Sequence, residues 1–242
     1  MTMAITVLVV VPQEEELQPL VEALSALGHT AHVRRVGRLD VVVFEELRLG
    51  VALGGHGKVQ FAVQTQHLLD HLQEADTVVC AGAAGSLRDD LRCGDVVVGT
   101  CSVEHDYRLR FVPLPAPVHP GDLHAARAIE GMFADAPAGF SVRCGPIASG
   151  DEDVVDAARA QELSAQTGAV CVAWEGAGGA RATAFSDRAF LELRVITDGA
   201  DDNAASDYRM TLQTVMPNLA AVLAAWVQRS NNGIQQTAFG RS

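Results

Sequence analysis

Residues 6–16 read Thr6-Val-Leu-Val-Val-Val11 followed by Pro12-Gln-Glu-Glu-Glu16. The first six are short, continuous and mostly β-branched, which is typical of a strand buried on both faces of a mostly parallel sheet. The acidic residues that follow favour the positive end of a helix, which we expect from about Glu14 to Leu27. A buried strand, a polar corner and a helix in this order predict an α/β fold.

The same alternation of strand and helix patterns continues along the chain. Two apolar runs separated by Glu45-Glu46 predict a hairpin, and the proline-rich stretch from Arg110 to Pro120 predicts a loop. We therefore expect one α/β domain over residues 1–230, with helices on both faces of a central sheet, and a polar, frayed tail at residues 231–242. The expected strands cover residues 6–11, 41–44, 47–53, 77–80, 95–99, 140–147, 169–174 and 191–197, and the expected helices cover residues 14–27, 59–72, 123–132, 154–163, 176–186 and 204–227.

Composition narrows the classes of partner. The chain has 242 residues, of which 48% are hydrophobic, enough to bury a sizeable core. Its net charge of −12 disfavours binding to nucleic acid and to anionic membranes, so small molecules or copies of the chain are the expected partners. The first apolar run lacks the basic flank and cleavage site of a signal peptide, and the five cysteines are scattered without a CxxC pair. These features predict a cytoplasmic protein with reduced cysteines and no bound metal.

Polar residues follow four of the expected strands. Glu14-Glu15-Glu16 follows the first strand, Gly82 to Ser86 the strand that ends at Cys80, Trp174-Glu175 another, and Thr197-Asp198 the last. Ligands of open α/β sheets bind beyond the carboxyl ends of the strands, where these residues are expected to meet. Each segment taken alone also fits a plain structural role, because acidic residues cap helices and glycines permit turns.

Taken together, the segments carry a resemblance to a known family. In order along the chain they are Val11-Pro-Gln-Glu-Glu-Glu-Leu17, Gly55-His-Gly-Lys-Val59, Ala81-Gly-Ala-Ala-Gly-Ser-Leu87 with Cys93-Gly-Asp-Val-Val97, Ser149-Gly-Asp151, and Trp174-Glu-Gly-Ala177 with Arg194-Val-Ile-Thr-Asp198. This set resembles the nucleoside phosphorylase and nucleosidase superfamily, in particular the 5′-methylthioadenosine/S-adenosylhomocysteine nucleosidases, over most of residues 4–228. The resemblance implies a three-layer α/β/α sandwich around a mixed, partly barrel-like sheet, a homodimer or larger homo-oligomer, and chemistry without a cofactor.

The resemblance also implies roles for individual residues. Asp198 matches the general acid that protonates the purine at N7, and burial is what keeps such a carboxyl protonated. Glu175 matches the glutamate that holds the ribose hydroxyls, and Glu16 the acid that orients and deprotonates the attacking water. The substrate-binding positions carried over from the family include Ala84, Gly85 and Val154.

Four positions depart from the family pattern or leave two interpretations open. Asp153 stands where an aromatic residue commonly stacks on the base; it either accepts hydrogen bonds from the base or caps the following helix. Trp174 replaces a methionine and either walls the pocket or packs in the core. Gln13 replaces an apolar residue at the 5′ end of the substrate. Tyr208 stands where the family has an aromatic over the 5′ substituent, and an ordinary packing role fits it equally well.

The predicted activity is hydrolysis of the N-glycosidic bond of a purine-type nucleoside. Phosphorylases of the superfamily carry an arginine-bearing, glycine-rich loop after the first strand, whereas Pro12 to Glu16 places negative charge there, which would repel phosphate. Water is therefore the expected nucleophile. The alternatives are a phosphate-dependent phosphorylase, a futalosine hydrolase, and a nucleoside-binding protein without turnover.

Overall fold

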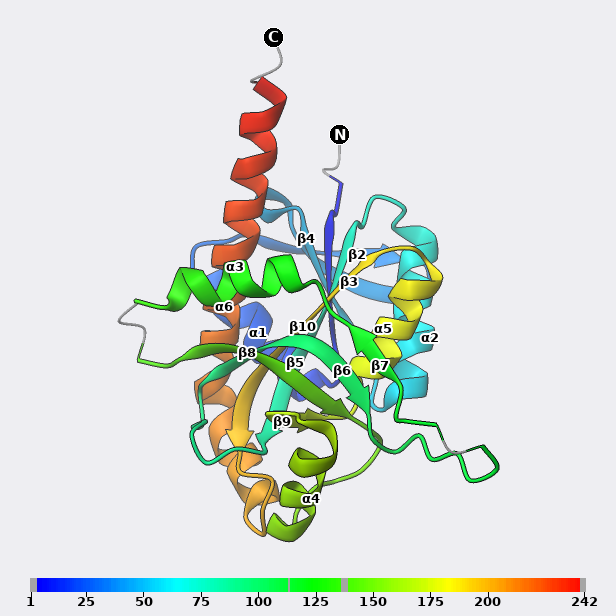
Figure 1. The fold of residues 1–242 in the computed structure, drawn as a ribbon. Coiled ribbons are helices and arrows are strands. Elements are labelled where there is room, and N and C mark those ends of the chain that lie inside the picture. Colours follow the sequence, from blue (N-terminus) through cyan, green and yellow to red (C-terminus); the bar gives the residue numbers. More distant parts are fainter. Residues whose placement is uncertain (1–3, 113, 136–138, 240–242) are drawn as a thin grey trace.

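A computed structural model describes residues 4–112, 114–135 and 139–239, and it has one mixed sheet with helices on both of its faces (Figure 1). The strands are β1 Val7–Val11, β2 Ala31–Val36, β3 Leu39–Phe44, β4 Leu49–Leu53, β5 Thr77–Ser86, β6 Val96–Glu104, β7 Val118–Pro120, β8 Val142–Ser149, β9 Cys171–Ala173 and β10 Ala189–Asp198. The helices are α1 Glu14–Ala26, the 3-10 turn η1 Glu45–Leu47, α2 Lys58–His71, α3 Leu123–Phe133, α4 Ala157–Thr167, α5 Gly176–Phe185 and α6 Ala204–Phe239.

Five of the strands close into a ring. β5 pairs with both β9 and β10, β10 pairs with β6, β6 with β8, and β8 with β9. The remaining strands extend from β5 as an open sheet in the order β1, β4, β3, β2, with β7 added at the edge of β6. The mixed, partly barrel-like sheet expected from the sequence is therefore confirmed.

The first strand shows why the apolar run is continuous. Val7, Val9 and Val11 belong to the core that lies under α1, α3 and α6, whereas Leu8 and Val10 belong to a second core under α2 and α5. Successive side chains of a strand point to opposite faces, so a strand covered on both faces needs apolar residues at every position. All five residues of β1 are buried.

Several elements differ from the sequence-based expectation. The stretch from Arg110 to Pro120 is not a loop throughout, because its last three residues form β7 and pair with β6, and the helix expected from residue 154 begins only at Ala157. β2 was not expected, because its residues are largely polar and exposed and the strand is held only as the edge partner of β3. β5 does not end at Cys80 but continues to Ser86, since its small residues pair with β10 from Ala81 to Gly85. The last helix does not end near Val227: it continues to Phe239, through the segment expected to fray, and the Asn231 amide donates to the Leu47 carbonyl at 2.9 Å.

Among the described residues, one helix is long and apolar enough to cross a bilayer by length and composition alone, Ala204–Asn232 of α6. In the fold this helix packs against α1 and β10, and Leu212, Met216, Leu219 and Leu223 are buried in the first core. Its apolar face is thus already covered by protein, which identifies α6 as a core helix.

Candidate active site

A pocket of about 490 Å³ lies at the carboxyl ends of β1, β5 and β10, where the sequence places its polar corners. β1 and β10 both run parallel to β5, so the residues that follow these strands meet at one edge of the sheet. The structure brings all ten expected site residues to this pocket: Gln13, Glu16, Ala84, Gly85, Asp153, Val154, Trp174, Glu175, Asp198 and Tyr208.

Glu16 lies in the first turn of α1 with its side chain turned into the protein, and only 3% of the residue is exposed. One carboxyl oxygen accepts the Ala83 amide at 2.7 Å, and the other accepts the Gln13 amide at 3.2 Å. Burial raises the pKa of Glu16 to about 7, and the neighbouring Glu175 carboxylate adds to the increase. A carboxyl with this pKa exchanges a proton near neutral pH, as a general base must.

Asp198 ends β10 and lines the same pocket as Glu16. The Thr197 hydroxyl donates to one of its oxygens at 2.8 Å, and the Ala200 amide donates to the other at 3.0 Å. Burial raises the pKa of Asp198 despite these two hydrogen bonds, and the nearby Asp207 and Asp201 carboxylates raise it further. This environment favours the protonated form, which is the form that can protonate a departing base.

Glu175 is the third pocket carboxylate and stands just before α5. Its oxygens accept the Gly57 amide at 3.1 Å and the Arg194 guanidinium at 3.4 Å. Gly57 has a φ of +83°, a backbone conformation that L side chains rarely adopt, and this is the turn that aims its amide at Glu175. Glu175 is 4% exposed, so a sugar hydroxyl that hydrogen-bonds to it would do so in a nearly dry environment.

Two glycines of β5 make room for the carboxyl groups. A Cβ atom at Gly82 would lie 2.8 Å from Glu16 Oε1 and 3.0 Å from an Arg194 nitrogen, and a Cβ atom at Gly85 would lie 2.8 Å from Asp198 Oδ1. Real Cβ atoms do not approach polar atoms this closely, so any larger residue would displace the carboxyls. The glycines expected to form a turn are therefore strand residues whose missing side chains leave space for the site.

The structure bears on the two interpretations left open for Trp174 and for Asp153. The Trp174 ring lines the pocket and stacks on His56, with 4.2 Å between ring centroids. Asp153 does not cap the next helix, because α4 begins only at Ala157 and its cap is Asp156, whose side chain accepts the Arg159 amide at 2.8 Å. A role of Asp153 toward the base stays a prediction.

Tyr208 and Gln13 both reach the pocket wall. The Tyr208 hydroxyl is buried without a hydrogen-bond partner among the described residues, and burial together with the nearby Glu16 carboxyl raises the pKa of this phenol. Gln13 is the residue that precedes α1. Their contacts with a 5′ substituent stay predictions.

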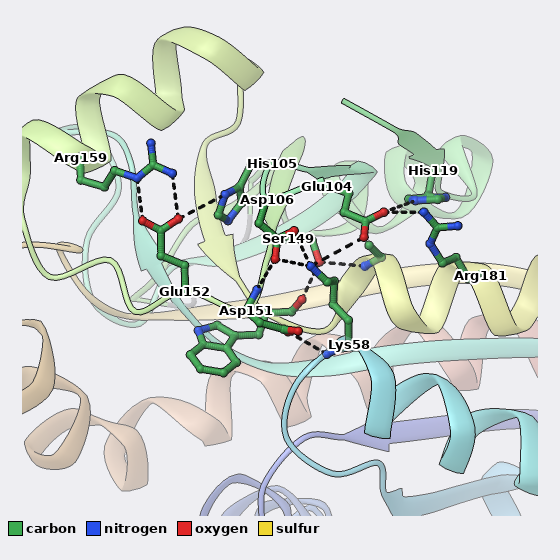
Figure 2. Close-up of polar contacts among 12 residues, drawn as sticks. Lys58, Glu104, His105, Asp106, His119, Ser149, Asp151, Glu152, Arg159 and Arg181 are labelled. Atoms are coloured by element: carbon green, nitrogen blue, oxygen red, sulfur yellow. Dashed lines mark hydrogen bonds and ion pairs between the residues drawn. The ribbon is translucent and has the colours of Figure 1, made fainter. Parts of the chain in front are cut away.

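A network of charged side chains anchors the pocket loop that follows β8 (Figure 2). Lys58, the only lysine of the chain, forms an ion pair with Asp106, and its ammonium lies 3.7 Å from Glu104. The Lys58 amide donates to Asp151 at 2.9 Å, and the Asp151 amide donates to Asp106 at 2.9 Å. These contacts tie the start of α2 and the end of β6 to the loop. Glu152, the next residue, lines the pocket.

Two residues of the site were not expected from the sequence. His56 belongs to the motif Gly55 to Val59 without a role of its own, yet it lines the pocket, and its Nδ1 lies 3.7 Å from Glu175. Arg194 was quoted as part of a motif, yet it is the guanidinium buried beside Glu175. Two charged residues, Glu192 and Arg194, inside the mostly apolar strand 191–197 were the available indication, because a buried charge needs a partner.

The ring of strands, the helices on both faces and the carboxylate-lined pocket define an α/β protein built to bind a small molecule at the carboxyl ends of its strands. The chain belongs to the phosphorylase superfamily, whose family model matches residues 5–228. It is 29% identical over 203 residues to a 5′-methylthioadenosine/S-adenosylhomocysteine nucleosidase of Thermotoga maritima, covering 80% of this chain and 85% of that protein.

Solved structures are similar over nearly the whole chain. A futalosine hydrolase of Helicobacter pylori has a TM-score of 0.79 at 25% identity, covering 92% of this chain and 97% of that one. A 5′-methylthioadenosine/S-adenosylhomocysteine nucleosidase of Neisseria meningitidis, in complex with methylthio-immucillin-A, has a TM-score of 0.80 at 28% identity, covering 93% and 99%.

Proposed function

We propose that this protein is an enzyme that hydrolyses the N-glycosidic bond of a purine nucleoside, releasing the free base and a ribose derivative. The observation that carries the proposal is the pair of buried carboxyls with raised pKa values, Glu16 and Asp198, in one pocket with Glu175. The nucleosidases and the futalosine hydrolase to which the chain is similar support the same class of reaction.

The three carboxyls suit the charges that develop as the bond breaks. The departing base gains negative charge, which protonation by Asp198 relieves. The sugar gains positive charge, and Glu175 binds an electron-poor sugar more strongly than the ground state, so it favours the transition state. Glu16 removes the proton of the attacking water. Each group is held by the hydrogen bonds described above, so little reorganisation is needed during the reaction.

Water is favoured over phosphate as the nucleophile by the charges around Glu16. Glu15, Glu16 and Glu175 line this side of the pocket, and the buried Arg194 is engaged by carboxylates. A phosphate dianion would be repelled by the carboxylates and would find this guanidinium occupied. Hydrolysis without a phosphate requirement is therefore the expected reaction.

The test is base release from a panel of nucleosides with and without phosphate, followed by mass spectrometry. The panel includes methylthioadenosine, S-adenosylhomocysteine, adenosine, inosine and futalosine, so it also identifies the 5′ substituent that the pocket accepts. Asp198→Asn should reduce kcat by about 10²–10⁴-fold while circular dichroism stays unchanged. Base release that requires phosphate, or full activity of Asp198→Asn, would refute the proposal.

We further propose that the enzyme acts as a homodimer in the cytoplasm. Large apolar side chains are exposed on α2, at Val59 and Val63, and on the loop after β6, at Phe111 and Val112. The ion pair between Lys58 and Asp106 holds the start of this loop beside the start of α2, and exposed apolar side chains such as these are typical of protein interfaces. All five cysteines are free thiols, as expected in a reducing compartment. Light scattering after gel filtration should give the mass of a dimer, and Phe111→Asp should yield monomers.

A further inference from the structure

Glu192 is a buried carboxylate to which the mechanism above assigns no role. It lies on β10 two residues before Arg194, so the two side chains project from the same face of the strand. Each of the two residues is only 1% exposed. The next residue on this face, Ile196, packs with residues from all the other ring strands, which places Glu192 and Arg194 inside the ring.

The surroundings of Glu192 are shaped to hold a carboxylate against Arg194. One Glu192 oxygen accepts the Arg194 Nε at 2.9 Å, and the other accepts the hydroxyl of Ser102 on β6. Gly176 leaves the space that the carboxylate occupies, because a Cβ atom there would lie 2.3 Å from Glu192 Oε2. Both oxygens are thus partnered, as a buried charge requires.

The other edge of the same guanidinium faces the pocket. Its terminal nitrogens lie 3.4 Å from Glu175 and 3.3 Å from the Ala83 carbonyl. The Ala83 amide in turn donates to Glu16 at 2.7 Å. Arg194 therefore lies between Glu192 on one side and the two pocket carboxylates on the other.

One guanidinium thus contacts two carboxylates, Glu192 and Glu175, and its charge also acts on Glu16. The other titratable groups near this set are the thiols of Cys80 on β5, Cys101 on β6 and Cys171 on β9, the His56 imidazole beside Glu175, and the Tyr208 phenol near Glu16. Burial raises the pKa of all three thiols, so they are neutral in the working range and add no charge. The charged side chains within this set are thus Arg194, Glu192, Glu175 and Glu16.

We propose that Glu192 is a positioning residue: it holds Arg194 by its Nε edge and takes up part of its charge, so that Arg194 orients Glu175 without neutralising the general base Glu16. This inference rests on the proposed hydrolysis. Without Glu192 the full positive charge of Arg194 would act on the pocket carboxylates. Glu16 would then lose its proton at lower pH and would be a weaker base.

The test is the pH profile of kcat in Glu192→Gln, which keeps the shape of the side chain and removes its charge. The acid limb of the profile should move to lower pH by about one unit, which raises the ratio of kcat at pH 6 to kcat at pH 8 about fivefold. Ser102→Ala is the matched control, because it removes a hydrogen bond from Glu192 but leaves the charge. Its ratio should equal that of the wild type.

An unchanged ratio in Glu192→Gln, or an equal shift in Ser102→Ala, would overturn the proposal. A measurement on the wild-type enzyme keeps it testable if Glu192→Gln does not fold. In a ¹³C NMR titration of the glutamate carboxyls, Glu16 should take up its proton near neutral pH, and uptake only below pH 5 would show that Arg194 does neutralise Glu16 and would overturn the proposal. Failure of the proposed function itself looks different, since the wild type would then release no base at any pH.

Discussion

Replacing Glu16 by glutamine should remove activity and at the same time stabilise the protein at alkaline pH. The pKa of this buried carboxyl is raised from 4.5 to about 7, so the folded protein holds its proton more tightly than the unfolded chain does. The stability that this proton contributes is fully present below pH 4.5 and is lost as the pH rises to about 7. At pH 8 the wild type carries a buried carboxylate that Glu16→Gln lacks.

The size of the effect follows from the pKa. One pKa unit corresponds to roughly 1.4 kcal/mol, so between pH 5 and pH 8 the wild type loses roughly 2–3 kcal/mol of unfolding free energy at this group. Glu16→Gln does not titrate and loses none of it. For a chain of this length, that difference corresponds to roughly 4–12 °C in Tm.

The assay is denaturant unfolding of the wild type and Glu16→Gln at pH 5 and pH 8. The change in the difference between the two proteins isolates the titration, because the packing of the amide is the same at both pH values. Glu15→Gln is the control, since it removes a charge from an exposed position in the same helical turn. A stability difference between wild type and Glu16→Gln that is equal at pH 5 and pH 8 would refute the reasoning.

Three further predictions follow from the same geometry. kcat should fall about tenfold per unit of pH below 7 as Glu16 gains its proton, and base release that is flat from pH 5 to 8 would exclude Glu16 as the base. Gly82→Ala should reduce kcat at least about 10²-fold by displacing Glu16, whereas Gly131→Ala in α3, where nothing lies within 4 Å of the new Cβ, should keep full activity and gain about 0.5–1 kcal/mol of stability. Asp156→Ala should lower the unfolding free energy by about 1 kcal/mol, because α4 loses its cap, and should leave kcat unchanged. A lower kcat measured without denaturant would contradict a purely structural role.

Local sequence patterns predicted the elements that bury a regular set of apolar residues. The unbroken apolar run of β1 and the helical spacing of α2 each follow from burial of a regular element, and both were expected within one or two residues of where they lie. The edge strand β2 was not expected, because a strand with exposed faces has no apolar pattern to show. The partly barrel-like sheet was expected only from the family resemblance, because no local pattern shows that Gly85 pairs with Val172, a residue far away in the chain.

The site residues were predictable to the extent that they follow strands. Glu16, Glu175 and Asp198 each stand at or just after the carboxyl end of a strand, where the fold gathers ligand-binding groups. Arg194 and Glu192 lie inside a strand, where the apolar pattern predicts core, and their partnership is visible only when both are seen on one face.

The charged residues inside the ring show how the fold tolerates buried carboxyl groups in the pocket. Ionisation of the buried Glu16 lowers the free energy of unfolding. The apolar residues buried on both faces of β1, the strand just before Glu16, offset this loss. Arg194 compensates part of the pocket's negative charge, but Glu192 takes a share of the guanidinium, so the compensation stays incomplete. If Arg194 were paired fully with the pocket carboxylates, the protein would be more stable, but Glu16 would be a weaker base. Burial raises the pKa of Glu16, and the incomplete pairing leaves Arg194 able to lower that pKa only in part, which is the state on which the proposed hydrolysis depends.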